Sequence, residues 1–210
     1  MAIVQDIVES VRSGLRDWDG LETTIAQTQS FINDAVQDAK NSGWLLTLED
    51  DESITFVANT YQYNVPASFA YVKELRVENT RTTPSTWDEI VPKHFWEIRL
   101  DSSVPVFFIH QGFPIPVDKK MKVIGQQRPT IYSSGTVGMA ETVDEGFESF
   151  LRERATAFSL RFQATGNPSL ELDRTRISLA GAAMSQSEIM LSRHPQENRV
   201  DIGAEHVPGR

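Results

Sequence analysis

The hydrophobic residues of this 210-residue chain recur at two different intervals, and the change of interval divides the sequence into three parts. In residues 1–46 and 143–193 they recur every three or four positions, which is the spacing of one face of an α-helix. Between residues 52 and 135 apolar and polar residues alternate, which is the spacing of a half-buried β-strand. We therefore expect an α+β protein with helical ends and a middle built of strands.

The first helical part contains two apolar stripes, one over residues 3–15 and one over residues 21–39. Gly43 follows the second stripe and can end it, because glycine adopts the left-handed backbone conformation at little cost. Two helices with such a short connection are expected to pack as a hairpin.

The second helical part begins with Thr142 and Glu145, whose spacing is that of a capping box. Gly166-Asn167-Pro168 is expected to end this helix, because proline cannot continue it. A last helix is then expected over residues 170–192.

The middle of the chain contains short strand patterns separated by turn residues, which is typical of a small antiparallel sandwich or barrel. Residues 87–100 are ambiguous between a short helical turn and an irregular edge segment. The expected strands start at Ile54, Tyr61, Tyr71, Val104 and Met121. The predicted organisation is thus a helical bundle from residues 1–46 and 143–193, an inserted β domain over 47–142, and an extended arm over 194–210.

Composition limits the functions that this chain can have. It has no cysteine, which excludes disulfides and thiol catalysis and removes the usual ligands of structural zinc. Its net charge is −9, and residues 1–50 alone hold nine acidic and three basic residues. General nucleic-acid binding depends on cations, so an acidic chain is a poor candidate for it. No apolar run approaches membrane-spanning length, and no signal peptide is visible at the start, so no membrane contact is expected.

No residues predict a catalytic, cofactor-binding or metal site. Histidines in metal sites usually stand close in sequence, whereas those of this chain are scattered. A Ser–His–Asp triad stays open, because its members need only meet in space, but no Gly-x-Ser-x-Gly motif supports one. The four histidines are His94, His110, His194 and His206.

Two groups of residues are candidates for contacts between copies of the chain. Ala180, Gly181 and Ala183 form a small-residue segment of the last helix that another backbone could approach closely. Lys119 and Lys120, with Lys122, form the one basic cluster, which is expected on a hairpin turn and a solvated strand face and could meet an acidic neighbouring subunit.

The C-terminal segment has too little apolar surface to fold alone. It alternates polar residues with isolated apolar ones, which is typical of an arm that becomes ordered when it pairs with a partner. A disordered tail is the other interpretation. The residues expected to bind the partner are Arg193, Arg199, Val200, Ile202 and Val207.

Three segments resemble the head-to-tail adaptor, or connector, proteins of tailed bacteriophages. They are Thr60-Tyr61-Gln62-Tyr63-Asn64-Val65-Pro66-Ala67-Ser68-Phe69, the Val104–Phe108 strand with its following Phe113-Pro114-Ile115-Pro116, and Val123-Ile124-Gly125-Gln126-Gln127-Arg128-Pro129. Together with the helical ends they cover most of residues 1–193, as a similar layout without an invariant motif.

The resemblance implies a non-enzymatic virion protein, made in the host cytoplasm and located at the head–tail junction. It implies a ring, commonly of twelve subunits, that binds the portal protein through the C-terminal arm and meets tail, nozzle or other neck proteins. DNA would pass through the channel without sequence-specific binding. No cofactor is implied.

Three other functions remain open. The first is another phage neck or tail completion protein, which contact with the tail tube rather than the portal would identify. The second is a small hydrolase, which requires His94 or His110 in a convergent Ser/His/Asp pocket. The third is a carbohydrate-binding module, which requires Tyr61, Tyr63 or Phe113 to form an exposed platform.

Overall fold

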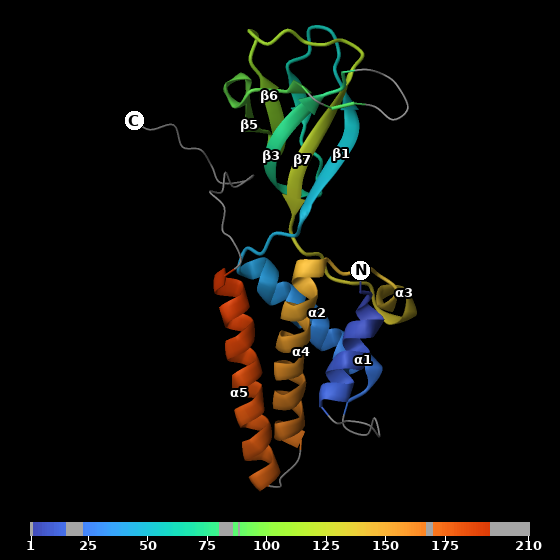
Figure 1. Ribbon diagram of the computed structural model, residues 1–210, viewed down its shortest axis with the longest axis vertical. Coiled ribbons are helices and arrows are strands. Elements are labelled where there is room, and N and C mark those ends of the chain that lie inside the picture. Colours follow the sequence, from blue (N-terminus) through green and yellow to red (C-terminus); the bar gives the residue numbers. More distant parts are fainter. Residues whose placement is uncertain (1, 16–22, 80–85, 88, 167–169, 194–210) are drawn as a thin grey trace, which may run out of the picture. The chain divides into compact units, whose positions relative to one another are not determined.

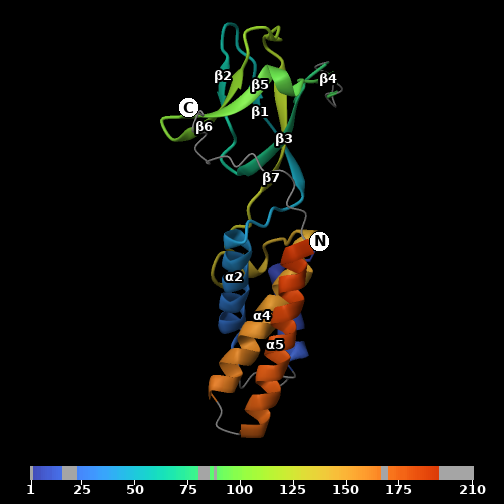
Figure 2. The ribbon, with the colours of Figure 1, turned by 90° about the vertical axis from the view of Figure 1, so that its left-hand side faces the viewer.

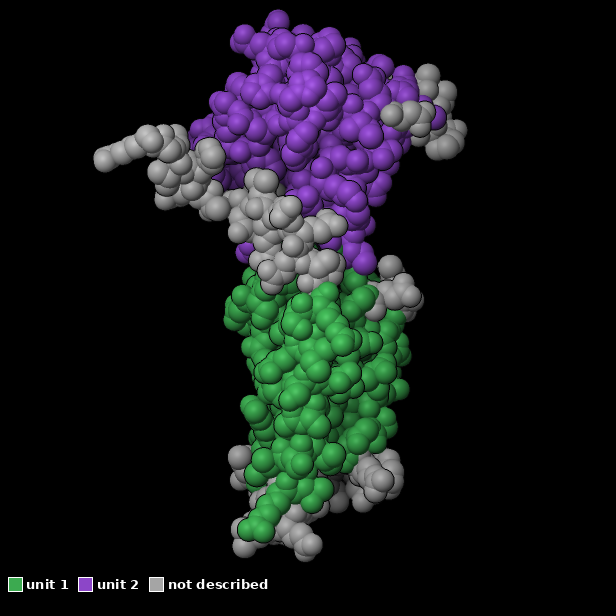
Figure 3. Space-filling model, turned by 60° about the vertical axis from the view of Figure 1, so that its left-hand side comes forward, with its two compact units in different colours: residues 1–46, 129–196 green, residues 47–128, 197–210 purple. Residues whose placement is uncertain are grey.

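The computed structural model describes residues 2–15, 23–79, 86–87, 89–166 and 170–193. In these residues the chain is a mixed α and β protein with five α-helices and antiparallel sheets. It forms two compact units, one from the two ends of the chain and one from its middle, Thr47–Arg128 (Figures 1 and 3).

The unit formed by the two ends of the chain is helical, because both ends carry amphipathic stripes that bury one face. We call it the helical unit. Its core combines Ile7 and Val11 of the first helix, Ile32 and Val36 of the second, and Phe150 of the fourth. The helices are α1 (Val4–Gly14), α2 (Ile25–Asn41), α3 (Gly135–Met139), α4 (Glu145–Gly166) and α5 (Leu170–Arg193).

Local signals explain where α2 begins and where it ends. Thr24 and Gln27 cap α2 reciprocally, since Gln27 N donates to Thr24 Oγ1 at 3.2 Å and Thr24 N to Gln27 Oε1 at 2.8 Å. The predicted stop at Gly43 is confirmed, with φ at 75°.

The capping box predicted at Thr142 is wrong, because α4 begins at Glu145 and Asp144 caps it. The Asp144 carboxylate accepts from Gly146 N at 3.1 Å, and its carbonyl accepts from Phe147 N at 3.0 Å. Thr142 instead forms a β-bridge with Ile3, which brings the starts of α1 and α4 together.

The helical unit resumes at Pro129, earlier than the expected residue 143, because the segment before α4 is bonded to α2. Asn33 donates to the carbonyl of Tyr132 at 3.1 Å and accepts from its N–H at 3.0 Å. Gln29 donates to the carbonyl of Ser133 at 2.8 Å. Sequence periodicity could not reveal these side-chain-to-backbone contacts.

The middle unit contains two sheets, with strand orders β1-β7-β3-β4 and β2-β6-β5, in which every pair is antiparallel (Figure 2). Each sheet keeps open edges, so the described strands do not close into a barrel. Both sheets contribute to one core, with Leu75 and Met121 from the first sheet and Phe107 and Ile109 from the second. The strands are β1 (Leu48–Thr55), β2 (Gln62–Asn64), β3 (Phe69–Val77), β4 (Glu89–Ile90), β5 (Trp96–Asp101), β6 (Val104–Ile109) and β7 (Lys120–Gln127), with a short 3-10 turn at Lys93–Phe95.

The first strand begins at Leu48, before the predicted start at Ile54. The additional part, Glu49-Asp50-Asp51-Glu52, is poor in strand-forming residues, so its alternation was not recognisable. Two interactions with β7 compensate for this weak strand propensity. The backbone of β1 pairs with that of β7, and Lys122 of β7 forms ion pairs with Asp50 and Glu52.

Candidate functional site

Arg154 of α4 joins three helices of the helical unit. Its guanidinium donates to Asp38 of α2 at 2.9 Å from Nε and 2.7 Å from Nη2, and to Ser187 Oγ of α5 at 3.3 Å. Glu188 of α5 lies 3.8 Å away. Planar guanidinium geometry suits such multiple contacts, so Arg154 fixes the position of α5 against α4 and α2.

Buried small and polar side chains also occur on α4 and α5, beside the apolar Met190 and Leu191 of α5 that pack on the helical core. Ala180, Ala183 and Ser187 of α5 are buried, as are Ser159 and Gln163 of α4. Within the described residues, the Ser159 hydroxyl and the Gln163 amide nitrogen have no hydrogen-bond partner. Such groups cost free energy when buried, so these contacts hold α5 less firmly than apolar ones would.

These contacts change the interpretation of the small-residue segment on α5. Ala180 and Ala183 face the chain's own α4 side and are buried, so they are not accessible to another copy. Gly181 lies on the exposed side, and a Cβ atom built there would meet no atom within 4 Å. Only the exposed member of this group is therefore open to a partner.

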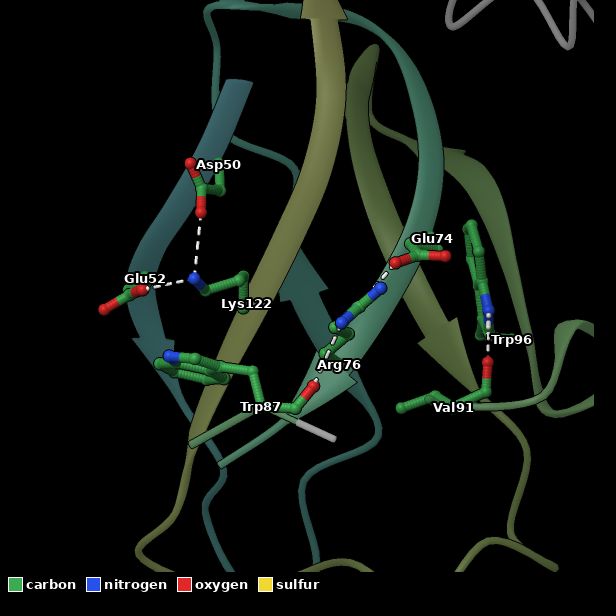
Figure 4. A network of polar contacts seen from close by, with 8 residues as sticks. All are labelled: Asp50, Glu52, Glu74, Arg76, Trp87, Val91, Trp96 and Lys122. Carbon is green, nitrogen blue, oxygen red and sulfur yellow. Dashed lines mark hydrogen bonds and ion pairs between the residues drawn. The ribbon is translucent and has the colours of Figure 1, made fainter. Parts of the chain in front are cut away.

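A charged network crosses the exposed face of the four-stranded sheet (Figure 4). Lys122 of β7 contacts both Asp50 and Glu52 of β1 at 2.8 Å, and its ammonium lies 4.8 Å from the centre of the Trp87 ring. Burial disfavours the Lys122 ammonium, but hydrogen bonds to the two carboxylates outweigh this and raise its pKa. The same hydrogen bond to Lys122 lowers the pKa of Asp50.

The network continues on β3, where Arg76 Nε contacts Glu74 at 2.6 Å and Arg76 Nη1 donates to the carbonyl of Trp87 at 3.3 Å. Figure 4 shows these side chains following one another across the strands. The charges largely neutralise each other. The face is therefore a structural network that holds β1 and Trp87 on the sheet, rather than a binding site for a charged ligand.

The predicted basic cluster is divided by the structure. Lys122 is paired with Asp50 and Glu52 of β1, and Lys119 Nζ donates to the carbonyl of Asn79 at 3.3 Å. Lys120 is exposed, and its backbone N–H donates to the Glu78 carboxylate at 3.0 Å. Lys119 and Lys120 stay predicted contact residues.

The two histidines proposed for a hydrolase do not belong to a Ser/His/Asp site in the described residues. The His94 ring lies against Phe95, with ring centroids 4.2 Å apart, and the His110 ring meets Phe108 edge-on at 5.7 Å. Neither imidazole is hydrogen-bonded to a serine or a carboxylate in the described residues.

The carbohydrate alternative lacks its platform, because two of its three aromatic residues are buried. Phe113 and Tyr63 are both buried in the core of the middle unit. The Tyr63 hydroxyl closes a turn by accepting from Val57 N at 3.1 Å and donating to the Thr60 carbonyl at 3.0 Å. Tyr61 is half-buried.

The helical unit also contains an open pocket of about 410 Å3. Tyr132 contributes to its wall, and the pKa of that phenol is raised, first by burial and then by the carboxylates of Glu141 and Asp144. No set of three histidine or carboxylate side chains stands where it could hold a metal ion, as far as the structure describes the chain. The pocket lining comprises Leu46, Pro129, Thr130, Tyr132, Ala140, Glu141, Thr142, Asp144 and Phe147.

Arg193 is the exposed last residue of α5. Arg199, Val200, Ile202 and Val207 lie outside the described residues.

Comparison with known proteins gives no identification. No protein-family model matches the chain, and no curated protein is similar to it at a significant level. In the described residues, no helix combines the length and the apolar character needed to cross a membrane.

Proposed function

We propose that this chain is a non-enzymatic virion structural protein, a head-to-tail adaptor that forms a ring beneath the portal of a tailed phage. The observation that carries the proposal is the architecture: a two-sheet unit inserted between the two halves of a helical unit. The segments that resemble the adaptor family supply β2 with its turn, β6, and the exit from β7. A structural role also agrees with the side chains of the described residues, which stabilise the fold without converging there on a reactive centre.

In this proposal the helical unit forms the body of the ring, and the two sheets pack as a sandwich around their shared core. The acidic character of residues 1–50 would repel DNA that passes through the channel, so that DNA slides without binding. The C-terminal arm would bind the portal, and weak contacts repeated around the ring would add up to a stable assembly.

Imaging of purified phage particles tests the proposal directly. We expect the chain in a ring between portal and tail, commonly of twelve copies. Density for the chain at the tail tube without portal contact would instead identify the other candidate, a neck or tail completion protein. Absence of the chain from particles would refute both.

The arm can be tested separately by deleting residues 195–210 and measuring binding to the portal protein. A matched variant keeps the length and replaces Val200, Ile202 and Val207 with serine. We expect both changes to weaken portal binding at least about tenfold, because the apolar anchors repay the cost of ordering the arm. Unchanged binding would exclude the arm as the portal contact.

A further inference from the structure

The three-stranded sheet of the middle unit ends in an open edge at β5. On β6, Pro105 and Ile109 bond to the chain on either side of β2, at 3.0 and 2.8 Å. Leu100 of β5 stands opposite Pro105, and Ile98 stands opposite Phe107. Since those β6 residues bond to the β2 side, the backbone groups of Leu100 and Ile98 point away from β6. Within the residues that the structure describes, no hydrogen bond reaches them from that side.

The side chains of β5 alternate between charged and apolar. Ile98 packs against the core of the middle unit, so Glu97, Arg99 and Asp101 lie on the other face. Leu100, on the core face, is nevertheless 44% exposed. The strand contains no proline that would block pairing. An edge with open backbone groups and an exposed apolar side chain is a template for a further strand.

The other open edges suit a further strand less well. β2 has three residues and β4 has two. β1 is longer, but its charged residues are all acidic, so it would repel the carboxylates of an added strand. Among the described edges, β5 is therefore the one that combines length with charges of both signs.

The C-terminal arm contains a segment whose charges match those of β5. This segment, residues 199–203, lies outside the described residues, and its sequence is Arg-Val-Asp-Ile-Gly. In an antiparallel pairing with Asp201 opposite Arg99, Arg199 stands opposite Asp101. Both pairs are of opposite charge, which stabilises cross-strand neighbours. Arg99 contacts Glu97 and the Phe108 ring, yet its side chain is 50% exposed and accessible to a further carboxylate.

The apolar side chains match in the same register. Val200 stands opposite Leu100, and Ile202 stands opposite Ile98, so that the exposed Leu100 side chain gains a cover. Gly203 stands opposite Glu97 and adds no side chain there. A shift by one residue would turn every arm side chain to the other face and place charges against apolar groups.

We propose that residues 199–203 of this chain pair with the open edge of β5 as a fourth strand of the three-stranded sheet. The antiparallel orientation follows that of the strand pairs described in this unit. The arm of the same copy and the arm of a neighbouring copy present the same side chains, and cross-linking distinguishes these two sources. The inference goes beyond the proposed function, because it gives the arm a position on the protein itself, from which a portal would displace it.

Hydrogen exchange of the full-length chain tests the pairing at the backbone. Paired with the arm, the N–H groups of Ile98 and Leu100 should exchange at least about tenfold more slowly than in a chain that ends at Arg193. Val123 of β7, which pairs on both sides, is an internal control and should exchange alike in both chains. Equal exchange of Ile98 and Leu100 in the two chains would overturn the inference.

Charge reversal tests the register. Asp201→Arg or Arg99→Asp alone places like charges opposite each other, and each should speed exchange at Leu100 by about threefold or more. The double variant restores an opposite pair with the signs exchanged and should recover most of the lost protection. Glu205→Arg makes the same change outside the paired segment and should leave Leu100 unaffected. A double variant as fast as the single ones, or an equal effect of Glu205→Arg, would contradict the inference. Circular dichroism should show every variant folded.

The absence of cysteine allows a direct test by disulfide formation. Arg99→Cys with Asp201→Cys places two thiols in a non-hydrogen-bonded pair, whose Cα atoms are about 4.5 Å apart and within disulfide range. This double variant should oxidise at least about tenfold faster than Glu49→Cys with Asp201→Cys, which probes the β1 edge. Equal rates would count against the pairing. Electrophoresis without reductant gives the source, since a linked monomer means the arm of the same copy and a linked dimer means that of a neighbour.

Orientation is tested with a second set of cysteines. Arg199→Cys should link to Asp101→Cys and not to Glu97→Cys, and the reverse preference would overturn the antiparallel pairing. If particles contain the ring but the arm leaves exchange at Ile98 and Leu100 unchanged, this inference fails while the proposed function stands. If the chain is absent from particles, the proposed function fails and the exchange measurement still decides this inference.

Discussion

Arg154 on α4 donates two hydrogen bonds to a single carboxylate oxygen of Asp38 on α2, at 2.9 Å from Nε and 2.7 Å from Nη2. The Arg154 side chain is mostly buried, and it also reaches Ser187 on α5. One side chain therefore couples the first and last parts of the chain, which lie more than a hundred residues apart in sequence. This relationship leads to the first prediction.

Arg154→Met should lower the free energy of unfolding by about 1–3 kcal/mol, because it leaves the Asp38 carboxylate without its main hydrogen-bond donor. Urea unfolding measures the change. Arg152 provides a matched control, since it belongs to a more exposed ion pair with Glu148 one turn away, and Arg152→Met should cost less than about 0.5 kcal/mol. Equal effects of the two substitutions would show that Arg154 is not a joint between the helices.

Gly138→Ala should destabilise the helical unit by at least about 2 kcal/mol, because the added Cβ would lie 1.6 Å from the Ser133 carbonyl oxygen. Gly181→Ala is the matched control, since its Cβ meets open space on an exposed helix and should stabilise by up to about 1 kcal/mol. Thermal unfolding should therefore shift in opposite directions for the two variants. A shift in the same direction would contradict the packing described around α3.

Ser159→Ala should leave stability unchanged or raise it by about 1 kcal/mol, because the buried hydroxyl has no hydrogen-bond partner in the described residues. Ser187→Ala should instead lower stability by about 1 kcal/mol, since that hydroxyl accepts from Arg154 and donates to the Met184 carbonyl at 2.7 Å. Chemical denaturation of the two variants distinguishes these outcomes. A loss at Ser159 as large as that at Ser187 would mean that the hydroxyl is bonded after all.

Lys122→Met should raise the pKa of Asp50 toward the ordinary value of about 3.9, because the substitution removes the hydrogen bond that lowers it. A carboxyl whose pKa is lower in the folded than in the unfolded state stabilises the fold above the unfolded pKa. This contribution is lost as the pH falls through the folded pKa. The original chain should therefore lose part of its stability below about pH 4 through Asp50, and Lys122→Met should not. Carboxyl titration followed by NMR measures the pKa, and an unchanged value in the variant would exclude the assigned cause.

Tyr132 should make the fold sensitive to alkali. Burial and two neighbouring carboxylates raise the pKa of its phenol in the folded state, so the neutral form is favoured there. The resulting stability is fully present below the unfolded pKa of about 10 and declines as the pH rises above it. Tyr132→Phe should make unfolding less dependent on pH above 10. The difference in phenolate absorbance between the original chain and Tyr132→Phe should show that Tyr132 ionises above the ordinary pKa of about 10, and ionisation at or below that value would contradict its burial.

The spacing of apolar residues predicted which parts of the chain are helical and which are strands. Particular residues show why this was possible. Ile7, Val11, Ile32 and Val36 recur at helical spacing and enter one core, as an apolar stripe must when it leaves water. Gly43 ends α2 because its conformation depends on the residue itself and not on distant contacts. The strand at Val104–Ile109 was recognisable for the same local reason.

Contacts between distant residues decided the rest. The acidic β1 strand exists because Lys122, far along the chain, neutralises it, and segment 129–142 joins the helical unit because Asn33 and Gln29 bond its backbone. Small residues on α5 looked equivalent in sequence, yet α4 covers Ala180 and Ala183 and leaves Gly181 open. Hydrophobic period is a property of neighbouring residues, so the amino-acid sequence by itself determined the kinds of element and their order. Which face of an element is covered, and which charge meets its partner, depends on what the fold places beside it, and only the tertiary structure decided that.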